Sequence, residues 1–243
     1  MPITASAVIK FAKTVIPFIV EVARYRSGQS AVIRSESRLL PAIVIAAGGE
    51  GARIGGQKPM RLLGDKPLLA HSIARALPQS DCLALAVRDA AQIEPILPEA
   101  AGLPLLRDAR PGCGPISALV SAFAFATAQG RPHVMLIGCD QPFLPLDLAL
   151  RLGEALNDHK VAMPVSGGKH QPLAALWRVD KAALAEYVAK GGASLWRFAA
   201  VQGVVHVEWP QGEACDPFAN VNDPADLAAS ETQFSTTART PGR

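Results

Sequence analysis

The residues best suited to chemistry in this chain lie in a glycine-rich segment in its first quarter. A run of apolar residues at 42–47 leads directly into a segment with five glycines that also carries Arg53 and Lys58. Glycines let backbone N–H groups approach phosphate oxygens because no Cβ stands in the way, and the two cations can neutralise the charge that the amides leave. The segment therefore predicts a binding site for a polyphosphate.

This segment matches neither of the two commoner phosphate-binding motifs. Gly49 and Gly51 are followed by Ile54 at the position where the dinucleotide fingerprint needs a third glycine. A P-loop needs lysine directly after Gly56, and Gln57 stands there instead. We therefore expect another kind of nucleotide site. A purely structural turn is the alternative, although such turns rarely need five glycines interleaved with cations.

Length and composition favour one large α/β domain, which we place at residues 41–230. The chain has 243 residues, of which 49% are hydrophobic, enough for a well-filled core. The net charge of +3 comes without a basic run, which argues against nucleic acid and for a small anionic substrate. The four cysteines form no C-x-x-C pair, which argues against a zinc site or a disulfide scaffold and favours a cytoplasmic location.

Both ends of the chain differ from this domain. Residues 1–40 form an extension of uncertain role, with an apolar run at 15–22 that is broken by Pro17 and Glu21. That run is shorter than the ~20 residues of a membrane span and has no cleavage site after it, so we expect neither an anchor nor a signal, and no membrane partner. A helix packed on the domain and a poorly ordered extension both remain open. Residues 231–243 are rich in Ser, Thr and Arg, which predicts a disordered tail.

Short apolar runs alternate with helical patterns after Pro41. The predicted strands are 42–47, 82–87, 104–106, 133–138, 161–165, 173–177 and 204–208. The predicted helices are 68–77, 90–97, 116–128, 146–156, 181–189, 194–201 and 224–229. This alternation predicts a three-layer α/β fold, with a mostly parallel sheet and helices on both faces. Ligands of such sheets bind beyond the carboxyl ends of the strands.

One predicted strand end carries a candidate metal ligand. The strand at 133–138 delivers Asp140 at its carboxyl end. Magnesium typically takes one or two protein carboxylates and fills its other positions with phosphate and water, so Asp140 is the predicted ligand for Mg²⁺. The alternative is a turn or a helix cap, for which Asp147 is the better candidate.

Two further loops contain polar residues near predicted strand ends. Asp108 lies in a Gly/Pro-rich loop before an apolar helix and could bind a sugar hydroxyl or a base edge, while a merely solvated role is about as well supported. Asn220 and Asn222 precede a helix start marked by Asp223 and Pro224. Capping explains Asp223. Capping does not explain Asn220 and Asn222, whose side chains would point the same way on an extended segment because they alternate in sequence.

The histidines are less informative. His170 lies in a loop that could face substrate. The other four, at 71, 133, 159 and 206, have no spacing that makes a metal site, so we expect them to be structural or exposed.

Motifs along most of the chain resemble those of one enzyme family. They are Ala46-Ala47-Gly48-Gly49, Arg53-Ile54-Gly55-Gly56, Lys58, Gly64-x-x-Pro67-Leu68, Arg107-Asp108-x-x-Pro111-Gly112-x-Gly114-Pro115, Cys139-Asp140-x-Pro142-Phe143, His170-Gln171-Pro172 and Asn220-Val221-Asn222-x-Pro224-x-Asp226-Leu227. Their order and spacing resemble the nucleotidyltransferases, and within these the molybdenum cofactor guanylyltransferases of the MobA type, over about residues 41–229.

The resemblance implies a Rossmann-like nucleotidyltransferase fold and a reaction with Mg²⁺ as cofactor. GMP would pass from GTP to the terminal phosphate of molybdopterin cofactor, giving the guanine dinucleotide cofactor and pyrophosphate. Transient contact with molybdoenzymes or their chaperones stays open. The implied site comprises backbone groups of Ala46, Ala47, Gly48 and Gly49 along the nucleotide, Arg53 and Lys58 on phosphates, Asp108 at the nucleoside, Asp140 on Mg²⁺, and Asn220 and Asn222 toward the pterin-phosphate side, with Arg53, Lys58 and Asp140 as the catalytic set.

Three positions depart from the family pattern. Gln57 stands where the family usually has Asp before the loop lysine, in a loop that is one residue shorter. Ala86 replaces an Asn that often reads the nucleoside, and Ile116-Ser117-Ala118 replaces Leu-Ala-Gly. These departures concern base choice more than phosphate chemistry, and a cytidylyltransferase acting on the same cofactor is the main alternative. A catalytically silent nucleotide-binding module is less favoured, and a dehydrogenase less again, because the dinucleotide fingerprint fails.

Overall fold

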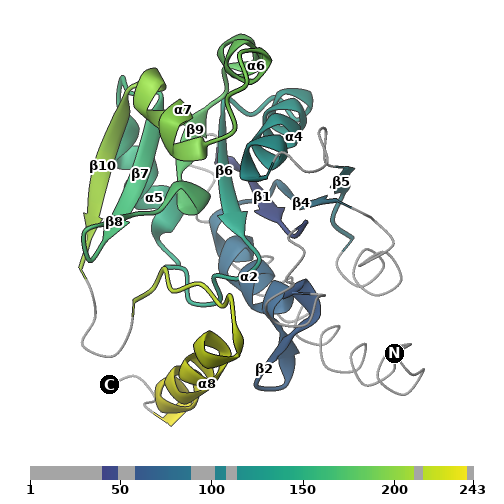
Figure 1. The fold of residues 1–243 in the computed structure, drawn as a ribbon, viewed down its shortest axis with the longest axis vertical. Coiled ribbons are helices and arrows are strands. Elements are labelled where there is room, and N and C mark those ends of the chain that lie inside the picture. Colours follow the sequence, from purple (N-terminus) through teal and green to yellow (C-terminus); the bar gives the residue numbers. More distant parts are fainter. Residues whose placement is uncertain (1–39, 49–57, 89–101, 108–113, 211–215, 240–243) are drawn as a thin grey trace, which may run out of the picture.

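A computed structural model describes residues 40–48, 58–88, 102–107, 114–210 and 216–239. Its main feature is an eight-stranded sheet in the order β10-β7-β9-β6-β1-β4-β5, with β8 paired to β7 (Figure 1). These strands are β1 (Ala42–Ala46), β4 (Leu83–Val87), β5 (Leu105–Arg107), β6 (His133–Gly138), β7 (Val161–Ser166), β8 (Lys169–His170), β9 (Leu176–Arg178) and β10 (Val204–Trp209). The helices are α2 (Leu68–Ala76), α4 (Pro115–Ala128), α5 (Leu148–Leu156), α6 (Lys181–Ala189), α7 (Leu195–Gln202) and α8 (Pro224–Arg239).

The sheet is mostly parallel, as the sequence predicted. β1 pairs in parallel with β4 and β6, and the β4–β5 and β7–β10 pairs are also parallel. The short strands β8 and β9 are antiparallel to their neighbours. From β1 the chain proceeds to β4 and β5 on one side, then returns to β6 on the other. The strand order thus reverses between β1 and β6, and this is where open α/β sheets bind ligands.

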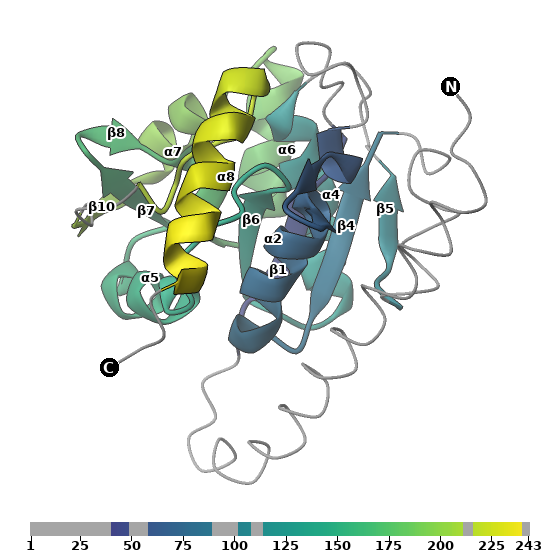
Figure 2. The ribbon, with the colours of Figure 1, turned by 90° about the horizontal axis from the view of Figure 1, so that it is seen from below.

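Helices cover both faces of the sheet, which confirms the predicted three-layer α/β class (Figure 1 and Figure 2). Successive residues of a strand point to opposite faces. Accordingly, Ile43 and Ile45 pack with α2 and α5, whereas Ala42 and Val44 pack with α4 and α7. Burial on both faces explains why β1 reads as a continuous apolar run.

Some predicted boundaries differ from the structure. The strand predicted at 173–177 begins only at Leu176, because Pro172 starts the short 3-10 turn η6 (Pro172–Ala174). The helix predicted at 146–156 begins at Leu148. A hairpin of β2 (Leu62–Leu63) and β3 (Lys66–Pro67) was not predicted. The helix predicted at 90–97 lies outside the described residues.

The last helix is longer than predicted. The helix expected at 224–229 continues as α8 to Arg239, so residues 231–239, which were expected to be disordered, are helical. The segment between Pro224 and Arg239 contains no glycine and no further proline, so nothing in it stops a helix. α8 contacts β2 and crosses the view in Figure 2. No helix in the described part of the chain is long and apolar enough to cross a membrane.

Candidate active site

The carboxyl ends of β4, β1 and β6 are joined by backbone hydrogen bonds. The N–H of Cys139 donates to the carbonyl of Ala46 at 3.2 Å, and the N–H of Ala47 donates to the carbonyl of Ala86 at 2.8 Å. Gly48 follows at once, and a Cβ there would lie 3.0 Å from the backbone N of Arg88. Glycine therefore lets the chain leave β1 close against the end of β4.

Asp140 is oriented by the turn that follows β6. The side chain of Gln141 is buried, and its Oε1 accepts a hydrogen bond from the N–H of Gly138 at 3.2 Å. A Cβ on Gly138 would collide with Oδ1 of Asp140. The absence of a side chain at position 138 thus leaves room for the Asp140 carboxylate to turn back against the end of its own strand.

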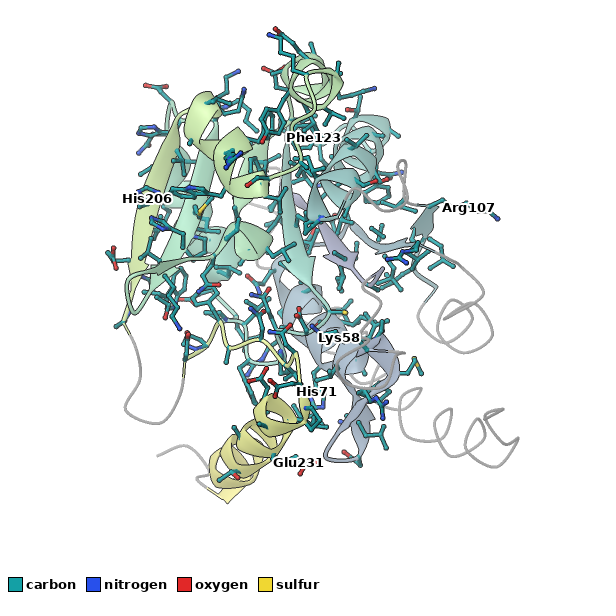
Figure 3. All side chains as sticks on the ribbon, viewed as in Figure 1. Lys58, His71, Arg107, Phe123, His206 and Glu231 are labelled. Carbon is teal, nitrogen blue, oxygen red and sulfur yellow. The ribbon has the colours of Figure 1, made fainter. Side chains whose placement is uncertain are left out.

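Lys58 connects two distant parts of the chain at this strand end. It begins the short 3-10 turn η3 (Lys58–Met60), and its Nζ lies 2.6 Å from Asp140 Oδ2 and 2.7 Å from Asn222 Oδ1. Only 12% of the Lys58 side chain and 14% of the Asp140 side chain are exposed. Figure 3 places Lys58 between the ends of the strands and α8. An ammonium group has three donors, so one remains after these two bonds within the described part of the chain.

Asn222 is held beside Lys58 by its neighbours in sequence. Val221 is fully buried in a small cluster with Leu63 and Leu68, and its N–H donates to the carbonyl of Asp140 at 2.9 Å. The N–H of Asn222 donates to Asp226 Oδ2 at 2.8 Å. The segment before α8 is therefore fastened both to the core and to the end of β6.

Asp223 caps α8, as the sequence suggested. Its Oδ1 accepts from the N–H of Asp226 at 2.8 Å, a bond that satisfies one of the unpaired donors of the first helical turn. Asp140 does not cap α5, because that helix begins at Leu148. Asp147 occupies the cap position of α5, yet its side chain makes no capping hydrogen bond.

A cavity of about 260 Å³ opens at these strand ends. The N-terminus of α4 faces it, and the partial positive charge of a helix N-terminus favours an anionic or polar ligand. Lys58 and Arg88 add full positive charges to the wall. The residues that line the cavity are Ala46, Gly48, Lys58, Ala86, Val87, Arg88, Gly114, Pro115, Ala118, Gly138, Cys139, Asp140 and Leu173. The arrangement suits phosphate groups.

The cavity wall fits phosphate-bound Mg²⁺ better than a metal site made of protein ligands alone. Asp140 is the one carboxylate among the described residues that line it. No group of three or more His, Cys, Asp or Glu side chains in the described ranges is placed to hold a metal ion. A single carboxylate is enough where substrate phosphates and water supply the other oxygens.

Cys139 cannot act as a nucleophile at neutral pH. Its thiol is buried, and burial together with the adjacent Asp140 carboxylate raises the pKa of Cys139 to about 12. The thiolate is the reactive form, so this thiol stays inert.

The structure brings together part of the predicted site. Ala46, Gly48, Lys58 and Asp140 line one cavity, and Asn222 touches Lys58. The roles assigned to these residues stay predictions.

The remaining predicted site residues are not among the described residues that line this cavity. The N–H of Ala47 is already bonded to Ala86, so it is not available to a nucleotide. The side chain of Asn220 is exposed and makes no hydrogen bond within the described part of the chain. Gly49, Arg53 and Asp108 lie outside the described residues. Sequence reasoning missed Gly138 and Gln141, whose only signal was their position beside Asp140.

The fold is the α/β fold of nucleotidyltransferases of known structure. The crystal structure of molybdopterin-guanine dinucleotide biosynthesis protein A from Archaeoglobus fulgidus matches with a TM-score of 0.65 and 21% identity, covering 80% of this chain and 99% of that one. A 2-C-methyl-D-erythritol 4-phosphate cytidylyltransferase from Thermus thermophilus matches with a TM-score of 0.58 and 19% identity, covering 79% and 98%. At these identities the likeness concerns the fold alone.

Sequence comparison identifies the family. The model of the MobA-like NTP transferase domain matches residues 43–205. A molybdenum cofactor guanylyltransferase of Cereibacter sphaeroides is 37% identical over 191 residues, which cover 78% of this chain and 94% of that protein. One of Rhodopseudomonas palustris is 36% identical over 203 residues, covering 79% and 92%. The chain therefore belongs to the MobA-like NTP transferase family, as its motifs predicted.

Proposed function

We propose that this enzyme transfers GMP from GTP to the terminal phosphate of molybdopterin cofactor and releases pyrophosphate. The observation that carries the proposal is the contact of Lys58 Nζ with both Asp140 and Asn222 at the strand-order reversal. The names of the relatives, molybdenum cofactor guanylyltransferase, support the choice of both substrates.

The reaction requires little covalent chemistry from the protein. An oxygen of the acceptor phosphate attacks the α-phosphorus of GTP, the bond from that phosphorus to the bridging oxygen breaks, and pyrophosphate leaves. Lys58 and the N-terminus of α4 would hold the negatively charged phosphates in line. Asp140 would hold Mg²⁺, which when bound neutralises charge on the triphosphate.

Guanine recognition in this proposal does not depend on position 86. Ala86 lines the cavity without a polar side chain, and its carbonyl is bonded to Ala47. Guanine offers N1–H and N2–H₂ donors, which a carboxylate or backbone carbonyls can accept. A polar site matched to those donors would leave its acceptors unpaired with adenine, at about 1–3 kcal/mol for each group. Asp108 is the proposed acceptor.

Competition between nucleotides tests this function. The protein is incubated with molybdopterin, Mg²⁺ and equal concentrations of GTP, CTP, ATP and UTP, and the nucleotide joined to the cofactor is identified. We expect GMP to be incorporated preferentially. Preferential incorporation of CMP would overturn the guanylyl assignment and leave the nucleotidyltransferase class intact. Binding of GTP without release of pyrophosphate would indicate a silent module.

A further inference from the structure

Three rings from separate segments meet on the surface, and we call this cluster the ring platform. It consists of His170 on β8, Trp196 on α7 and His206 on β10, all of them exposed. The centroid of the His170 ring lies 4.2 Å from that of Trp196 and 4.6 Å from that of His206. Trp196 is 37% exposed, although large aromatic side chains are usually more fully buried. Rings gathered at the surface are suited to stacking against a planar ligand.

The ring platform and the cavity lie on the same face of the sheet. His206 pairs with Met163 of β7, and His170 pairs with Val165 of the same strand. Met163 packs into the core under α4 and α7, the helices on the cavity side. Val165 is two residues further along β7 and therefore points to the same face, and paired residues share a face.

The position of β8 brings His170 close to the end of β6. β10 pairs with one edge of β7 over all of Val161–Ser166, so β8 and β9 pair with the other edge. On that edge β9 pairs with the first residues of β7, and β8 pairs with its last two. That edge faces β6, and one strand spacing is about 5 Å. Leu173, three residues after His170, lines the cavity with Asp140, and three residues span at most about 10 Å.

We propose that the ring platform stacks the pterin of the acceptor substrate, a flat fused heteroaromatic ring, while the phosphate at the other end of the acceptor reaches Asp140. This inference rests on the proposed function. Indole and imidazole rings bind planar heteroaromatic groups by stacking. The exposed cations Lys169 and Arg197 adjoin two of these rings in sequence and suit an anionic acceptor. Figure 3 labels His206, on the edge strand, and Lys58, near the strand ends.

Tryptophan fluorescence tests pterin binding without the reaction. The chain has three tryptophans, of which Trp177 is 1% and Trp209 is 7% exposed, so Trp196 is the accessible one. The full chain is titrated with 6-carboxypterin in the absence of GTP. We expect saturable quenching that is largely lost in Trp196→Leu and weakened in His206→Ala. Equal quenching in the unaltered protein and in Trp196→Leu would overturn the proposal.

Kinetics separate stacking from a structural role. Trp196→Leu should raise KM for molybdopterin about fivefold or more while KM for GTP stays unchanged, because one stacked ring is lost. Trp196→Phe keeps a ring and should restore most of the acceptor affinity. Val201→Ala is the matched control, since Val201 lies on the same helix and is 69% exposed. It should leave both KM values unchanged.

Different results would contradict the ring platform and the proposed function. Transfer of GMP with an unchanged KM for molybdopterin in Trp196→Leu would overturn the ring platform and leave the function standing. Quenching that depends on Trp196, in a protein that transfers no nucleotide, would support pterin binding and contradict the proposed reaction.

Discussion

Lys58 Nζ lies 2.6 Å from Asp140 Oδ2, and the two residues are 82 positions apart in the chain. The contact joins the end of the glycine-rich segment to the end of β6, across the point where the strand order reverses. The Lys58 ammonium also donates a hydrogen bond to Oδ1 of Asn222, the residue that follows the buried Val221. Charged groups in a partly dehydrated site interact more strongly than they would in water. In the proposed function, Lys58 would receive phosphate charge at this point of the sheet.

Asp140→Asn should abolish most transfer while the fold is retained. The amide oxygen of Asn can still accept a hydrogen bond from Lys58, but the charge that would hold Mg²⁺ is lost. Turnover should fall about a hundredfold or more. The measurement is pyrophosphate release at limiting Mg²⁺, with thermal unfolding as the check on folding.

Asp81→Asn is the matched control for this substitution. The carboxylate of Asp81 is 60% exposed and contacts Arg131, away from the cavity. Its loss should leave turnover near normal. Near-normal turnover of Asp140→Asn at limiting Mg²⁺ would show that Asp140 is not the ligand.

Gly138→Ala should lower activity without changing any charged residue. The added Cβ would collide with Oδ1 of Asp140, so the carboxylate must rotate away from its present position. Small displacements of a reacting geometry can cost about a hundredfold in rate. The measurement is kcat for the variant against the unaltered enzyme.

Gly153→Ala provides the comparison, because Gly153 lies in α5 and a Cβ there meets nothing within 4 Å. Alanine in a helix interior should raise the free energy of unfolding by about 0.5–1 kcal/mol and leave turnover unchanged. If the two variants have equal turnover, Gly138 does not position Asp140.

The sequence predicted the parts of the fold that depend on local pattern. β1 and β6 are buried on both faces, so their apolar runs identified them, and Asp140, two residues after β6, could be inspected as a strand-end carboxylate. The same reasoning failed near Leu173, where Pro172 begins a 3-10 turn inside an apolar stretch. It also failed after Ala229, where a polar composition suggested disorder although nothing in the segment interrupts α8.

Contacts between segments that are far apart in the chain could not be predicted from the sequence. Asn222 was expected on the pterin-phosphate side, but its contact with Lys58 follows from burial of Val221 and from the path of the chain past Leu63. Trp196 and His206 carried no local signal, because their proximity arises only when α7 packs across β10. Register and packing, rather than composition, create both contacts.

Lys58→Ala should weaken GTP binding far more than Lys66→Ala. Lys58 lines the cavity, whereas Lys66 lies in the β2–β3 hairpin. Loss of a charged donor to phosphate should reduce affinity about tenfold or more. Titration calorimetry with GTP and Mg²⁺ measures both variants, and equal losses would mean that the phosphates bind elsewhere.

Removal of the residues before Arg38 should leave activity unchanged. The sheet begins at Ala42, and the upstream contacts that the structure describes are made by the carbonyls of Leu40 and Pro41, which accept from Arg131 and Ser80. Turnover and thermal unfolding of the truncated protein check this. Aggregation of that protein would show that the extension packs on the core. A deletion extended through Pro41 removes both acceptors and should lower the unfolding temperature.

The free energy of unfolding should decrease as the pH falls below about 6.5, the ordinary pKa of histidine. Burial lowers the pKa of His71 and of His133, and Arg178 lowers that of His133 further. Between the lowered pKa and 6.5 the unfolded chain binds more protons than the folded chain, so acid favours unfolding, whereas above 6.5 the full stability is present.

His133 Nε2 is buried without a hydrogen-bond partner in the described part of the chain, so protonation there gains no compensating contact. Urea unfolding of the unaltered protein and of His133→Gln measures the effect. The measurement is made at pH 7.5, 6.5 and 5.5, that is, at about the ordinary pKa of histidine and about one unit to either side of it. The variant should lose less stability over this range, and identical losses would show that His133 does not contribute to the pH dependence.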